Sequence, residues 1–172
     1  MKTATIPAPL RSCLTLTAAD LMTVPVLTIP HEMCLREAAR LLSESHVSGA
    51  PVVDDQGRCI GVLSSSDFVS WAGEGGKATT EKAEKVTCFI APWGELIDIE
   101  EAADSEMRQY MTTPPVVVTA GTFIGDVAQM MFDAHIHRVL VVNDHDYPHG
   151  IVTGTDILAA VARTARSAAK GR

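Results

Sequence analysis

Two short stretches of this chain carry one chemical pattern: GVLSSSDF at residues 61–68 and GIVTGTDI at residues 150–157. Each reads glycine, two apolar residues, a hydroxyl residue, two small residues and then aspartate. The stretches lie 89 positions apart (150 minus 61), and the same shift carries MTVP at 22–25 onto MTTP at 111–114. No gap is needed between these two anchors. The sequence therefore contains an internal duplication of roughly fifty residues per copy.

Length and composition restrict what this duplication can be. With 172 residues and 47% hydrophobic content, the chain can bury a core as one body or as two small lobes. A net charge of −7, with no cluster of Lys and Arg, disfavours nucleic acid or an anionic membrane surface as a partner. The 4 cysteines are too widely spaced for a C-x-x-C site. We expect reduced thiols in a cytoplasmic protein, with no signal peptide and no membrane span.

Each copy is expected to fold as strand, helix, strand, strand and helix. Before the first copy, Thr17 is expected to cap a short helix that ends before Pro25. Apolar runs and helical spacing then predict strands at 26–29, 50–53 and 59–63, with helices at 35–45 and from 65 toward 71. The second copy predicts strands at 116–118, 138–142 and 150–152, a helix carrying Ile124, Val127, Ala128 and Met131, and a longer final helix. The turn at 143–149 lacks the glycine of its counterpart at 54–57, so we expect a different shape there.

The segment between the copies has a different composition. It begins with GEGG at 73–76, continues with mixed charges, and carries six acidic residues and no basic one between Glu95 and Glu106. We expect domains at 18–72 and 109–166, joined at 73–108 by a partly flexible insertion that includes an acidic helix leading into Met111. Excising residues 75–85 should leave the core folded.

These motifs resemble tandem cystathionine β-synthase-type domains, or CBS domains, paired as a Bateman module. The resemblance rests on the two M-T-x-P openings, the two closing motifs and the order of elements, and it covers residues 18 to about 165 outside the insertion. It implies an α+β fold of two pseudo-symmetric domains, each a small three-stranded sheet with two packed helices, paired through their sheets. It also implies two clefts for adenosine-containing ligands such as AMP, ADP, ATP or S-adenosylmethionine, and a homodimer that regulates a partner protein.

The closing motif has a physical basis as a binding site. A hydroxyl residue and small residues where a strand turns into a helix expose backbone N–H groups that favour an anion such as phosphate. An ionised aspartate there accepts hydrogen bonds and suits the paired hydroxyls of a ribose. Ser64 with Asp67, and Thr153 with Asp156, also fit the capping box, in which these side chains only cap the helix.

The resemblance assigns the candidate ligand-binding residues. It implies that a hydroxyl residue from the opening of one repeat joins the aspartate of the other, so that Thr23 serves Asp156 and Thr112 serves Asp67. The pair His137-Arg138 matches a phosphate-binding pair of the family, whereas the first copy has Ser48-Gly49 there and offers no cation. The complete candidate set is Thr23, His137, Arg138, Thr153, Thr155 and Asp156 for one site and Thr112, Ser64, Ser66 and Asp67 for the other.

Other classes of function remain as alternatives. His135, His137, His145 and His149 lie close in sequence, but their spacing fits no tight metal pattern, so we expect no metal site there. No nucleophile has an adjacent base, which disfavours an enzyme. We therefore expect a regulatory module that senses an adenine nucleotide and needs no cofactor. The alternatives are an oligomerisation scaffold without a ligand and, less favoured, a histidine-based metal sensor.

Overall fold

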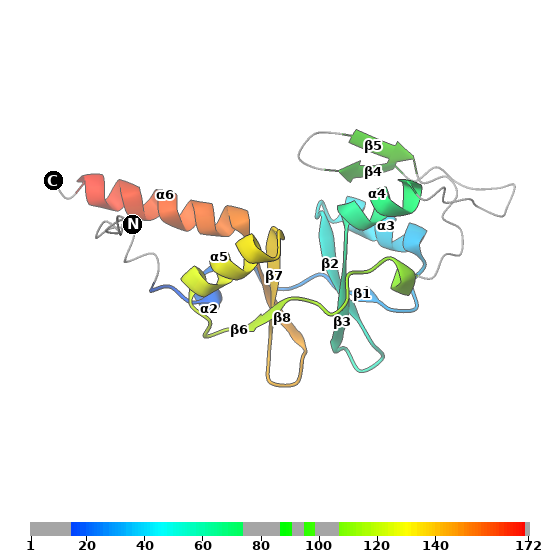
Figure 1. Ribbon diagram of the computed structural model, residues 1–172, viewed down its shortest axis with the longest axis horizontal. Helices are drawn as coiled ribbons and strands as arrows, with labels where there is room; N and C mark the ends of the chain where they lie inside the picture. The colour runs from blue at the N-terminus through cyan, green and yellow to red at the C-terminus, as the bar shows by residue number, and fades with distance from the viewer. Residues whose placement is uncertain (1–14, 74–86, 91–94, 99–106, 171–172) are drawn as a thin grey trace, which may run out of the picture. The chain divides into compact units, whose positions relative to one another are not determined.

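A computed structural model describes residues 15–73, 87–90, 95–98 and 107–170 of the chain (Figure 1). These residues form two compact units. Unit 1 combines the chain up to Val26 with the chain from Val116 onward, and unit 2 runs from Leu27 to Pro115. Each unit contains a three-stranded sheet with helices, which confirms the expected α+β fold.

Unit 2 carries the strands and helices of the first copy. Its elements are β1 (Ile29–Pro30), α3 (Leu35–Glu44), β2 (Gly49–Val53), β3 (Cys59–Ser64), α4 (Ser65–Gly73), β4 (Thr87–Ile90), β5 (Glu95–Asp98) and the 3-10 helix η1 (Met107–Gln109). β2 pairs in parallel with β1 and antiparallel with β3. β1 is shorter than the predicted strand, because only Ile29 and Pro30 pair with β2. Ile29, Leu35, Leu63 and Phe68 are among the buried residues that form its core.

Unit 1 repeats this arrangement with the second copy. It contains α2 (Ala18–Leu21), β6 (Val117–Thr119), α5 (Ile124–Asp133), β7 (Arg138–Val142), β8 (Pro148–Thr153) and α6 (Gly154–Lys170). β7 pairs in parallel with β6 and antiparallel with β8, as β2 pairs with β1 and β3. Thr17 and Asp20 cap the short helix α2, as expected: the Thr17 N–H and hydroxyl both donate to Asp20 Oδ2 at 2.8 Å. These two bonds lower the pKa of Asp20.

The apolar faces of α3 and α5 are covered within their own units. Leu35, Ala38, Ala39 and Leu42 of α3 are buried, as are Ile124, Val127 and Met131 of α5. A small sheet therefore suffices to bury these stripes, since each helix packs against buried strand residues of its own unit. These stripes are therefore largely withdrawn from solvent, with Ala128 half-buried.

The two strand-connecting turns have the same shape, contrary to expectation. In the first, Asp54 Oδ1 accepts from the N–H groups of Gln56 and Arg58, both at 2.9 Å. In the second, Asn143 Oδ1 accepts from those of His145 and Tyr147, at 3.0 and 3.1 Å. The left-handed residues are Gly57 (φ 79°) and Asp146 (φ 62°). A glycine is not required, because aspartate tolerates this conformation and asparagine makes the same side-chain turn as aspartate.

Two segments of the insertion form an antiparallel pair, β4 with β5. Residues 95–98 are thus a strand at a place where we expected part of an acidic helix. ELID does not alternate apolar and polar residues, so the sequence carries no clear signal for this strand. Residues 75–85, whose removal should be tolerated, lie outside the described residues.

Candidate functional site

Each opening motif pairs with the closing strand of the other repeat, inside one unit. In unit 1 the Thr23 N–H donates to Ile151 O at 2.9 Å, and the Ile151 N–H donates to Thr23 O at 3.2 Å. In unit 2 the Thr112 N–H donates to Val62 O at 2.9 Å, and the Val62 N–H donates to Thr112 O at 3.0 Å. The structure therefore places Thr23 in the same unit as Asp156, and Thr112 in the same unit as Asp67.

The glycine that begins each closing motif makes room for this crossing. A Cβ on Gly61 would lie 2.7 Å from Met111 Sδ and 3.1 Å from the Thr112 carbonyl oxygen. A Cβ on Gly150 would collide with Met22 Sδ and lie 2.8 Å and 2.9 Å from its Cγ and Cβ. The glycines are therefore needed for close approach by the methionine of the opposite opening.

The hydroxyl and the aspartate of each closing motif bond to one another. The Ser64 N–H and hydroxyl donate to Asp67 Oδ2 at 2.6 and 2.8 Å. The Thr153 N–H donates to Asp156 Oδ2 at 2.8 Å and its hydroxyl donates to the same oxygen at 2.6 Å. The Asp156 N–H also donates to Thr153 Oγ1 at 3.3 Å, which completes a reciprocal capping box. Helix capping is thus one role of both aspartates.

The first residue of each helix is tied to the loop before the adjacent strand. The Ser65 N–H donates to Ser48 O, and the Gly154 N–H donates to His137 O, each at 2.9 Å. The Ser65 hydroxyl adds a second bond to Ser48 O at 2.9 Å. These bonds fix where α4 and α6 begin, and they hold residue 48 or 137 next to the helix N-terminus.

The two sites differ in charge. Arg138 is the cross-strand partner of Thr153, so their side chains lie on the same face of the β7–β8 pair. The equivalent pair in unit 2 is Gly49 with Ser64, which offers no cation. His137 is exposed at the start of β7. Unit 1 thus has an arginine opposite Thr153 of its capping box, where unit 2 has a glycine opposite Ser64.

Two further candidate residues lie in the first turns of the two helices, and two lie beside the strands that precede them. Ser66 is exposed, and its hydroxyl lies 2.8 Å from that of Ser64. Thr155 is exposed in the first turn of α6. Thr23 and Thr112 are exposed beside the strands that lead to these helices. Each unit therefore gathers its candidate residues at one end of its sheet.

The four clustered histidines do not converge. His135 has a left-handed backbone (φ 52°) immediately after α5, and its counterpart His46 has φ 54° immediately after α3. These positions end helices, a role that the backbone alone explains. Within the described part of the chain, the group of three metal-ligating side chains is instead His31, Glu32 and Asp55, which the sequence analysis missed.

The sequence pattern of the CBS domain matches residues 18–74 and 105–163. The chain belongs to the CBS domain family. Both matches together cover the two copies and leave much of the insertion outside. The family therefore accounts for the duplication, the two openings and the two closing motifs.

Similar proteins extend over most of the chain. MJ1426 of Methanocaldococcus jannaschii is 27% identical over 157 residues, which cover 83% of this chain and 89% of that protein. A longer protein of the same organism, MJ1232, is 27% identical over 137 residues, but the match covers only 36% of it.

Solved structures share the fold. The CBS domain pair of MJ0100, in complex with 5′-methylthioadenosine and S-adenosyl-L-methionine, is 20% identical with a TM-score of 0.67 and covers 87% of this chain and 98% of that one. CBSX2 in complex with AMP is 22% identical with a TM-score of 0.63 and covers 86% and 97%. Within the described residues, no helix has the length and apolarity that crossing a membrane requires.

Proposed function

We propose that this CBS domain pair is a regulatory module that binds an adenosine-containing ligand, with its main site in unit 1. The observation that carries this proposal is the pairing of Thr23 with Ile151, because it brings an exposed hydroxyl to the strand that leads to Asp156. The ligands named for MJ0100 and CBSX2 all contain adenosine, which supports the same class of ligand here. Catalysis forms no part of the proposed function, and no permanently bound cofactor is required.

Asp156 is proposed to cap α6 and to bind the ribose at the same time. Both capping bonds that the Asp156 carboxylate accepts end on Oδ2. A carboxylate has about four acceptor sites on its two oxygens, so Oδ1 can accept from a ribose hydroxyl while the cap stays intact. Thr23 is proposed to add a second polar contact to the ribose from the opposite repeat. Helix capping and ligand binding are therefore compatible roles for this residue.

The phosphate is proposed to lie between the start of α6 and Arg138. The N-terminus of this 17-residue helix favours an anion through its dipole. Arg138 adds a guanidinium whose planar fork matches phosphate oxygens, and His137 and Thr155 add donors. Unit 1 should therefore prefer AMP or a longer phosphate chain to adenosine.

Unit 2 is proposed to hold a weaker or less anionic ligand. Ser64, Ser66 and Asp67 repeat the ribose side of the site, and Thr112 is the counterpart of Thr23. Because Gly49 stands where unit 1 has Arg138, the site lacks the cation that would discriminate for phosphate. An uncharged or cationic adenosyl group suits this site better.

Signalling is proposed to pass from the ligand to a partner protein or across a dimer. The sequence repeats are proposed to form domains at 18–72 and 109–166, with a connecting insertion at 73–108. A scaffold that works by oligomerisation alone is the alternative. Calorimetry with AMP, ATP, NAD and S-adenosylmethionine separates the two. Saturable heat with at least one of them is expected, whereas no heat from all four would support the scaffold.

A homodimer is the expected assembly, through exposed apolar side chains of unit 1. Phe132 on α5 and Leu158 on α6 are 74% and 70% exposed, and the two helices contact each other within unit 1. Large apolar side chains on adjoining elements are typical of an interface. At micromolar concentration, sedimentation should give twice the chain mass, and replacing both residues by serine should reduce it to the monomer mass.

Val47→Ser is the matched control, since Val47 is 40% exposed in unit 2 and belongs to neither helix. It should leave the dimer intact. A monomer mass for the unaltered protein that does not change with concentration would contradict the prediction.

A further inference from the structure

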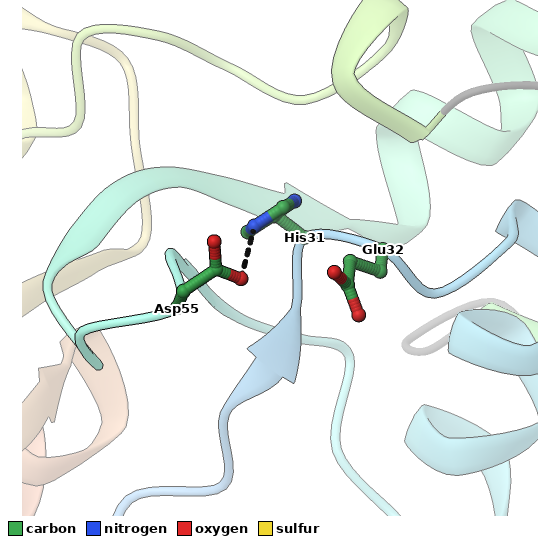
Figure 2. Close-up of side chains that lie close together, drawn as sticks. All are labelled: His31, Glu32 and Asp55. Atoms are coloured by element: carbon green, nitrogen blue, oxygen red, sulfur yellow. Dashed lines mark hydrogen bonds and ion pairs between the residues drawn. The ribbon is translucent and has the colours of Figure 1, made fainter.

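Three side chains with metal-binding atoms surround one space at the edge of unit 2 (Figure 2). His31 and Glu32 follow β1 directly, and Asp55 lies in the turn between β2 and β3. One ligand atom from each of the three lies within 4.8 Å of the others. We propose that His31 Nε2 and the carboxylates of Glu32 and Asp55 form a binding site for a divalent transition-metal ion of the zinc type.

The distances are close to those that a metal ion requires. Zinc binds nitrogen and carboxylate oxygen at about 2.0–2.2 Å in a tetrahedral arrangement, so two ligand atoms on one ion lie roughly 3.3–3.6 Å apart. The observed limit of 4.8 Å exceeds this by roughly 1.2–1.5 Å. Glu32 is exposed, so rotation of its side chain can close the remaining gap. The two carboxylates would together balance the charge of a divalent cation, and the imidazole favours zinc over magnesium.

The backbone holds two of the three ligands in place before any ion binds. The His31 N–H donates to Val53 O at 2.9 Å, which continues the β1–β2 pairing by one residue. Asp55 sits in the turn that the Asp54 carboxylate fixes through its bonds to Gln56 and Arg58. The hydrogen bonds from the N–H groups of Arg58 and Gln56 lower the pKa of Asp54, and the bond from Arg58 has the larger effect. The site therefore needs little rearrangement of the backbone, and a preorganised site binds more tightly.

A fourth residue, Arg108, determines which nitrogen of His31 carries the hydrogen. Arg108 Nη2 lies 2.8 Å from His31 Nδ1, and a guanidinium can only donate hydrogen bonds. Nδ1 must therefore accept, so the hydrogen is on Nε2, which lies 2.8 Å from Asp55 Oδ1 and donates to it. Without an ion, the site is a chain of hydrogen bonds from Arg108 through His31 to Asp55.

Metal binding and the Arg108 contact exclude each other. An ion on Nε2 needs the lone pair of that nitrogen, so the hydrogen moves to Nδ1 and the ring stays neutral. Nδ1–H and the guanidinium are then both donors, and Arg108 must withdraw. Its positive charge also repels the ion. Arg108 belongs to η1, which precedes the opening motif at 111–114, so an ion at this site would release a contact of that segment.

The second copy lacks this cluster and offers a matched control. With the shift of 89, His31 and Glu32 correspond to Ala120 and Gly121, while Asp55 corresponds to Asp144. The two turns that carry the aspartates have the same hydrogen bonds. Asp144 therefore reproduces the local setting of Asp55 without the other two ligands.

Calorimetric titration of the full chain with Zn²⁺ tests the proposal. The unaltered protein should bind zinc, and His31→Ala or Asp55→Asn should weaken this site at least about tenfold, whereas Asp144→Asn should not. Arg108→Gln should strengthen zinc binding by roughly tenfold or more, because a glutamine carbonyl can accept from Nδ1–H and the repulsion is gone. Arg163→Gln, the same charge change on α6, should have little effect.

The opposite signs of these effects separate the proposal from loss of the site through misfolding, which would weaken binding at this site in every variant. Absence of zinc binding to the unaltered protein would overturn the proposal. An unchanged titration of His31→Ala would also overturn it and would assign the ion to other histidines. Weaker binding by Arg108→Gln would contradict the exclusion of the ion by Arg108.

Discussion

Replacing Arg138 by alanine should weaken AMP binding by roughly tenfold to more than a hundredfold while changing adenosine binding little. A charge-assisted hydrogen bond is worth about 1.5–3 kcal/mol, and AMP has a phosphate that adenosine lacks. The residue lies opposite Thr153 in the β7–β8 pair, beside the first turn of α6. Calorimetric titrations of both ligands into the variant and the unaltered protein measure the difference.

The matched comparison uses the two aspartates. Asp156→Ala should weaken AMP and adenosine together, because the carboxylate is assigned to the ribose that both contain. Asp67→Ala should weaken AMP less, since unit 2 has glycine in place of the arginine. Equal losses of AMP and adenosine in Arg138→Ala, or a larger AMP loss from Asp67→Ala than from Asp156→Ala, would show that the phosphate binds in the other unit.

Gly150→Ala should lower the free energy of unfolding by about 1–3 kcal/mol. The new methyl group would collide with Met22 Sδ and lie 2.8 Å and 2.9 Å from Met22 Cγ and Cβ. Rotation of the thioether can relieve the first contact, but the Met22 Cβ is fixed to the backbone. Gly61→Ala should cost less, because its shortest contact, 2.7 Å, is with the flexible end of Met111. Urea unfolding of both variants measures the costs.

Gly121→Ala is the control for glycine replacement itself. No atom lies within 4 Å of the position that its Cβ would take, so its stability should stay the same or rise slightly. The double variant Gly150→Ala/Met22→Ala should be more stable than the sum of the two single effects predicts, because the smaller side chain removes the clash. Strict additivity would show that Met22 does not determine the cost.

Much of the fold follows from the duplication. Each element expected in the first copy has a counterpart 89 positions later, so every assignment can be checked twice. The helices α3 and α5 and the strands β3 and β8 all lie where the apolar spacing predicts them. The pairing of an opening with the opposite repeat is different. The spacing is the same in both copies and does not say which opening meets which closing strand. Resemblance to the family, and not periodicity, indicated that Thr23 belongs with Asp156.

The errors have identifiable physical causes. The turn at 143–149 was expected to differ because it lacks glycine, but Asn143 and Asp146 reproduce the bonds and the left-handed conformation. Residues 95–98 were expected within an acidic helix, yet they pair with β4 as a strand. The Ser64 and Thr153 capping boxes could be predicted from the sequence, since their two partners are only three residues apart.

The His31 cluster was missed because the repeat was treated as symmetric. His31 and Asp55 are 24 residues apart, and only the parallel pairing of β1 with β2 brings them together. A signal was present in the sequence: the dipeptide HE at 31–32 stands where the second copy has AG. In a duplicated chain, a position where only one copy has a metal-ligating side chain is therefore a candidate metal ligand.

The central claim is that the opening of one repeat and the closing motif of the other bind one adenosine-containing ligand. Amide chemical shifts of the 15N-labelled protein, recorded during a titration with AMP, test it most directly. We predict saturable changes that are largest at Thr23, Ile151 and residues 153–156, with smaller changes at Thr112 and residues 64–67. Saturable changes confined to residues outside both sets, or no changes up to millimolar AMP, would contradict the claim.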